Sequence, residues 1–185
     1  MLTAKSSIDE AEQFIEEYSS LLHPNHYHMV AIKHQLMQMY GRTEGYLIQD
    51  MDEAQLKRKE DLCREHLEVL KTIDPHAIRL MIFAAAAHFE LHMPLLQDAK
   101  RKWEAGKVST EDFRYNLKKN IFDTKLTKIT FSREALRDPH SHVKRAVELL
   151  QNETNDSLPE GQLRLQTVDT LAQLEGFMKT VGCQM

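Results

Sequence analysis

Cysteine, glycine and proline are scarce in this 185-residue chain. It has two cysteines, six glycines and five prolines, and 7% of its residues are aromatic. Two distant cysteines, Cys63 and Cys183, do not make a disulfide framework, so we expect a reducing compartment, cytoplasmic or nuclear. The longest apolar stretch, 80–88, is too short to cross a bilayer, and residues 1–5 lack the apolar segment of a signal peptide. We therefore expect no membrane partner.

Charge of both signs is plentiful but unevenly distributed. The net charge is −4 overall, with −7 over residues 1–99, +7 over 100–145 and −4 over 146–185. An acidic–basic–acidic pattern could match sections of one charged partner, although charge blocks more often mark solvated helix faces. The basic block mixes cations with acids and has few aromatic residues, so a nucleic-acid partner is not expected.

Long segments rich in Leu, Glu, Lys, Gln, Met and Ala favour helix, and no segment alternates as a strand does. We predict an all-α single domain, with a core over about 8–180, built as a tetratricopeptide-like array of about seven antiparallel helices. The predicted helices are 7–22, 26–40, 51–73, 76–92 (Pro94 interrupting this helix or starting the next, which continues to 106), one from Ser109 or Thr110, one from 140 to 152, and 162–179.

Prolines punctuate this pattern three times. Pro24, Pro75 and Pro139 each stand where one helical segment is expected to end and the next to begin, because proline suits the first helical position. Each lies beside a residue that can cap the new helix: Asn25, Asp74 or Asp138. The run 84–87, four alanines, lacks bulk and is expected at a close helix–helix contact near the domain centre.

The motifs of catalysis and metal binding are largely missing. His88 and His92 have a spacing that could chelate a metal, but no HExxH, CxxC or Cys/His quartet exists, so we interpret them as packing or surface residues. Cys63 lies among apolar positions and is interpreted as a small buried hydrophobe. The sequence has no Gly-rich phosphate loop and no GxSxG motif. We predict no catalytic residue, no metal site and no cofactor in this chain.

Five short segments follow one another in a fixed order: 22–27 (LHPNHY), 59–65 (KEDLCRE), 70–75 (LKTIDP), 90–95 (ELHMPL) and 159–161 (PEG). Together they resemble the C-terminal helical domain of SET-and-MYND-domain protein lysine methyltransferases, especially the arthropod members. The resemblance covers about residues 8–180. It implies a tetratricopeptide-like module that packs beside the SET domain and helps to shape the substrate cleft.

The catalytic parts of that family are not found here. The family uses a SET core with an Asn-His-Ser cofactor motif and Cys-rich zinc sites, whereas this chain has two cysteines and Asn25-His26-Tyr27 instead. S-adenosylmethionine and zinc would therefore belong to a parent enzyme. We expect a non-catalytic substrate-positioning or regulatory domain, present as an expressed fragment or a short natural product.

An alternative is a stand-alone tetratricopeptide-like adaptor that holds a peptide in its concave groove. Polar residues early on the helices that follow the prolines would line such a groove: Asn25, Lys33, Arg79 and Lys144. A pair of cations there could hold an acidic peptide, as chaperone-binding members of the repeat class do. The expected partner is a protein or peptide, a chaperone or a histone being the candidates, or the SET domain of a parent protein.

Overall fold

The computed structural model describes residues 4–102 and 122–180. Within these ranges the chain forms six helices and no strand: α1 (Ala4–Tyr18), α2 (Tyr27–Met39), α3 (Glu53–Ile73), α4 (Met81–Lys102), α6 (Phe122–Leu150) and α7 (Pro159–Thr180). A single isolated bridge joins Gly41 and Leu47 in the connection between α2 and α3. The all-α prediction is confirmed for this part of the chain. The helix expected from Ser109 or Thr110 begins outside the described residues.

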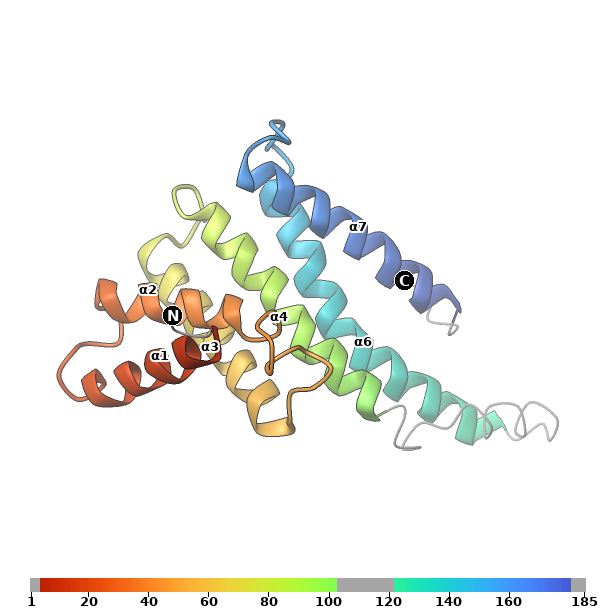
Figure 1. Ribbon diagram of the computed structural model, residues 1–185. Coiled ribbons are helices and arrows are strands. Elements are labelled where there is room, and N and C mark those ends of the chain that lie inside the picture. The colour runs from red at the N-terminus through yellow and green to blue at the C-terminus, as the bar shows by residue number, and fades with distance from the viewer. Residues whose placement is uncertain (1–3, 103–121, 181–185) are drawn as a thin grey trace.

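Each helix packs on the next one along the chain, and α4 is the centre of the arrangement (Figure 1). Helices α1, α2 and α3 lie on one side of α4, while α6 and α7 lie on the other. The long helices α4, α6 and α7 run side by side in alternating directions. α4 also contacts α2, α3 and α7 in addition to α6.

The alanine run explains how α4 can have so many neighbours. Residues 84–87 are all buried, and Ala85 and Ala87 are fully inaccessible. Since alanine side chains end at Cβ, the backbones of the neighbouring helices can come close to α4. The expected central position of this run is confirmed.

Three apolar clusters hold the array together. The largest joins α1, α2, α3 and α4 through side chains that include Ile8, Leu36, Leu62 and Leu91. A second joins α3, α4 and α6, and a third joins α6 to α7 through Leu136, Leu174 and Met178. The core is therefore shared between successive helices rather than collected at one point.

The proline predictions were partly wrong. Pro139 lies inside α6, which runs unbroken from Phe122 to Leu150. A proline inside a helix costs about 3 kcal/mol, but the residues that follow it on α6, Val143, Ala146 and Leu150, are completely buried, which offsets that cost. Pro94 likewise lies inside α4 rather than ending it.

Pro24 and Pro75 do lie between helices, as expected, but neither begins one. His26 caps α2, and its ring accepts the backbone N–H of His28. α4 starts at Met81 rather than His76, because the Asp74 carboxylate accepts the backbone N–H groups of Arg79 (2.7 Å) and Leu80 (2.8 Å) in the preceding turn. The proline that does occupy a first helical position is Pro159, at the start of α7.

Candidate peptide-binding groove

A groove lies between α3, α4 and α6, with a volume of about 590 Å³. We call it the α3–α6 groove. Each helix contributes residues at helical spacing, so one stripe of each faces the groove. Its apolar lining consists of Leu67, Leu70, Pro75, Ala77, Leu80, Ala84, Leu91 and Leu149.

Three cations, Arg64, Lys71 and Arg145, also line this groove. Arg64 and Lys71 lie two turns apart on α3, and Arg145 faces them from α6. The acids of the lining are Glu68 and Asp74, and the Asp74 carboxylate is already bonded to two backbone amides. Those amide bonds lower the pKa of Asp74, Leu80 N–H contributing most. The groove therefore combines an apolar lining with an excess of positive charge.

The groove arginines have partners that can be exchanged. Arg64 Nε donates to Glu60 Oε1 at 2.7 Å, and Arg145 Nη1 donates to Glu148 Oε2 at 3.2 Å. Both arginine side chains are about half exposed, so these ion pairs are screened and worth little. Among the described residues Lys71 has no ion pair. An incoming carboxylate can thus compete for all three cations.

A second hollow of about 560 Å³ continues the α3–α6 groove over the other side of α3. The two share Arg64 and Glu68 as lining residues. Pro24, Val30 and Lys33 supply its opposite wall. An extended segment of a partner could run from one hollow into the other across α3.

Two histidine pairs accompany these hollows. His88 Nδ1 and His142 Nδ1 lie 2.8 Å apart in the α3–α6 groove, where they join α4 to α6. His34 Nδ1 and His66 Nε2 lie 3.1 Å apart and join α2 to α3, with His66 in the wall of the second hollow. Burial is the main cause that lowers the pKa of His88 and of His66 to about 4, so both pairs are uncharged at neutral pH.

The four residues predicted to bind a peptide do not share one hollow. Asn25 is exposed in the turn between α1 and α2, where its backbone N–H donates to His23 Nδ1. Lys33 lines the second hollow and donates to Glu65 Oε2 at 2.6 Å. Arg79 lies exposed just before α4, and Lys144 lies exposed on α6. Of the four, only Lys33 lines one of the two hollows described above.

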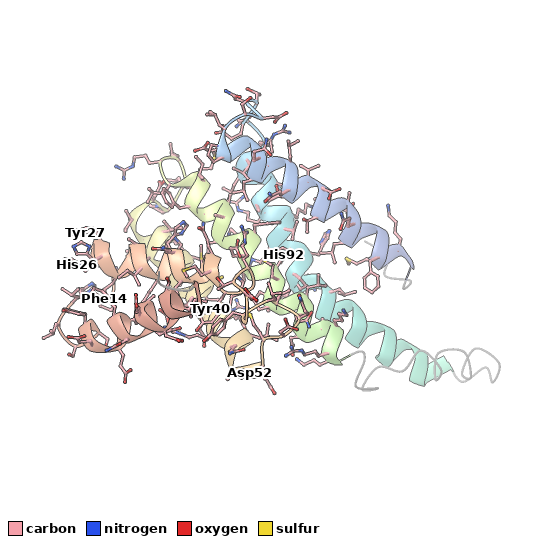
Figure 2. All side chains as sticks on the ribbon, viewed as in Figure 1. Phe14, His26, Tyr27, Tyr40, Asp52 and His92 are labelled. Atoms are coloured by element: carbon pink, nitrogen blue, oxygen red, sulfur yellow. The ribbon has the colours of Figure 1, made fainter. Side chains whose placement is uncertain are left out.

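The groove cations and the two histidine pairs were not predicted from the sequence. A signal for Arg64 and Lys71 exists, because they share one face of α3 with the partly buried Leu67. No such signal joins His88 to His142, since they are 54 residues apart. His92, which was interpreted together with His88 as a packing or surface residue, is buried on α4 (labelled in Figure 2). Its Nδ1 contacts the Phe89 carbonyl.

A polar network inside the core was also missed. Lys59 is completely buried, and its Nζ donates to Met37 O (2.6 Å), Tyr40 O (2.7 Å) and Glu90 Oε2 (2.7 Å). The other Glu90 oxygen accepts from Arg42. All three donors of the ammonium group are occupied, so this network ties α2, α3 and α4 together and has no donor left for a ligand.

Metal and membrane sites are not evident where the structure describes the chain. In that part, no group of three or more His, Cys, Asp and Glu side chains gathers as a metal site, and no helix is long and apolar enough to span a membrane. Burial raises the pKa of the Cys63 thiol to about 12, which keeps it protonated and unreactive. The interpretation of Cys63 as a buried hydrophobe is confirmed.

Comparison with known proteins gives no relative. No protein-family model, curated protein or solved structure matches the chain. A function must therefore be argued from the groove and its residues.

Proposed function

We propose that this chain is a non-catalytic helical module that binds an acidic segment of a protein partner in the α3–α6 groove. The observation that supports this most is the placement of Arg64, Lys71 and Arg145 around an apolar lining. A carboxylate bound to an arginine forms a charge-assisted hydrogen bond, while neighbouring leucine side chains of the ligand can be desolvated on the groove lining. A peptide with alternating acidic and apolar residues fits both features.

We further propose that the module belongs to a SET-and-MYND-domain protein lysine methyltransferase as its C-terminal, tetratricopeptide-like domain. The five ordered sequence segments support this, and the successive packing of antiparallel helices is compatible with it. In that setting the groove would hold a protein substrate or regulator beside the SET domain. Calorimetry with S-adenosylmethionine should give no binding heat with this chain, and micromolar binding would contradict a non-catalytic role.

The second candidate is a stand-alone adaptor that uses the predicted residues Asn25, Lys33, Arg79 and Lys144. The observation in its favour is the position of Lys33 in the second hollow, beside Pro24 and Val30. Both candidates bind an acidic peptide, but they differ in which cations the peptide contacts.

One charge-reversal series separates the two candidates. The probe is the peptide Ac-Glu-Leu-Glu-Leu-Glu-Leu, labelled for fluorescence anisotropy. Arg64→Glu combined with Arg145→Glu should weaken its binding at least about tenfold, because two charge-assisted contacts are lost. Lys57→Glu combined with Lys179→Glu changes the net charge by the same amount at exposed positions that line neither hollow; it is the matched control and should change affinity much less.

The outcome of the series is decisive for each candidate. A large loss with Lys33→Glu plus Arg79→Glu, and none with the groove arginines, would favour the adaptor and reject the α3–α6 groove. Absence of any binding by the unaltered chain would reject both.

A further inference from the structure

The paired histidines of the α3–α6 groove bring two ring nitrogens together at a place where a ligand would lie. His88 comes from α4 and His142 from α6, and both rings are partly exposed in the groove wall. The rings stack with centroids 5.1 Å apart. Because the two Nδ1 atoms are 2.8 Å apart, one nitrogen must donate a proton to the other, and two protonated rings would repel each other.

Charged groups of both signs surround the pair. For His142, Arg64 on α3 disfavours the protonated form, while Glu60 on α3 and Asp138 on α6 favour it. For His88, Arg145 on α6 disfavours the protonated form. His142 also disfavours protonation of its α4 neighbour His92. Glu68, Lys71 and Asp74 complete the charged lining on the α3 side. At neutral pH the pair is thus an uncharged patch between two arginines.

We propose that the His88–His142 pair is the subsite of the α3–α6 groove that anchors an acidic side chain of the ligand, and that it takes up a proton as the carboxylate binds. This inference rests on the proposed function, because it assigns the position of one carboxylate within the same groove. A carboxylate between Arg64 and Arg145 offsets the positive charge that opposes protonation. The protonated pair then presents an N–H donor to the bound anion.

Proton uptake makes affinity depend on pH in a definite direction. The pKa of free His88 is about 4, well below its ordinary value of 6.5. If the bound carboxylate raises the pKa of His88 back to its ordinary value, the affinity for the peptide rises about fourfold as the pH falls from 7.5 to 6.0. The reason is that the complex then binds more protons than the free chain and the free peptide together. The glutamate side chains of the probe remain ionised throughout this range.

The experiment is calorimetry of the full chain with Ac-Glu-Leu-Glu-Leu-Glu-Leu at pH 7.5 and 6.0, in two buffers of different ionisation enthalpy. We expect tighter binding at pH 6.0 and a buffer-dependent heat that reports net proton uptake. Circular dichroism at both pH values verifies that the chain is folded.

Two variants and a control locate the proton. His88→Gln and His142→Gln should each flatten the pH dependence, so that the roughly fourfold gain in affinity between pH 7.5 and pH 6.0 falls to about onefold, because the pair that takes up the proton is broken. His23→Gln, an exposed histidine in the turn after α1, should retain the full pH dependence. If a variant fails to fold, the buffer-dependent heat of the unaltered chain still decides the question.

The possible failures are distinguishable. Binding that is equally tight at both pH values with no buffer dependence overturns the histidine subsite but leaves the groove in place. Persistence of the pH dependence in both glutamine variants also overturns it. Absence of binding at either pH overturns the proposed function and this inference together.

Discussion

At the scale of single residues, the most informative side chain is Lys59. It is fully buried, yet its ammonium group has three oxygen partners, two of them the carbonyls of Met37 and Tyr40 at the end of α2. A buried charge is costly unless it is paired, and here Glu90 on α4 supplies the opposite charge. The network therefore fixes how three helices meet.

Removing one partner from this network should be strongly destabilising. We expect Glu90→Leu to lower the free energy of unfolding by about 3–5 kcal/mol, because it leaves the Lys59 charge buried without an anion. Lys59→Met should cost less, because Glu90 keeps its ion pair with Arg42. The double substitution should cost clearly less than the sum of the two. Urea unfolding followed by circular dichroism gives all four values of the cycle, and simple additivity would contradict the coupling.

At the scale of elements, the helix ends decide which segments become helices. α3 begins with a capping box at Asp52 (labelled in Figure 2). The Asp52 side chain accepts the backbone N–H of Gln55 at 2.8 Å, and the Gln55 side chain accepts the backbone N–H of Asp52 at 2.9 Å. α1 ends at Tyr18, four residues earlier than expected, and Leu21 is consequently 74% exposed. Local hydrogen bonds thus set boundaries that apolar periodicity leaves open.

The cap of α3 offers a prediction with a built-in control. Asp52→Ala should lower the free energy of unfolding by about 1 kcal/mol, because a backbone N–H at the helix start loses its acceptor. Asp52→Asn keeps an acceptor oxygen and should lower the free energy of unfolding by only a few tenths of a kcal/mol. Equal losses in chemical denaturation would show that the negative charge, rather than the cap, is what matters.

At the scale of the whole molecule, buried histidines on several helices make the stability of the fold depend on pH. Burial is the first cause that lowers the pKa of His66, His88 and His92 to about 4. In the unfolded chain these groups take up protons near pH 6.5, so the unfolded state binds more protons between pH 6.5 and 4. Stability is therefore complete above pH 6.5 and declines as the pH falls toward 4.

Each such histidine should contribute about 2 kcal/mol to the loss of stability between pH 7.5 and pH 5. We expect the midpoint of urea unfolding to fall markedly over this range. The variant His92→Leu should lose about 2 kcal/mol less than the unaltered chain, since its buried ring no longer titrates. An identical pH dependence in that variant would show that His92 does not have a lowered pKa.

The sequence was sufficient for the helical class and for the central position of the alanine run, because both follow from local composition. It was insufficient at Pro139, where packing of α6 on α4 overrides the local tendency of proline to end a helix. It was also insufficient for the groove, whose residues come from α3, α4 and α6. His88 and His142 meet only because these helices fold against each other, which periodicity within one helix cannot report.

Helix α4 contributes both to the main apolar cluster and to the groove, which limits how far the chain can be shortened. Leu91 belongs to the main apolar cluster, with α1, α2 and α3, and also lines the groove. A shortened chain without the first two helices would leave this leucine without those neighbours, and the recognition surface would lose its shape. For the proposed binding of a partner, the smallest folded unit therefore includes α1, a helix that lines neither hollow.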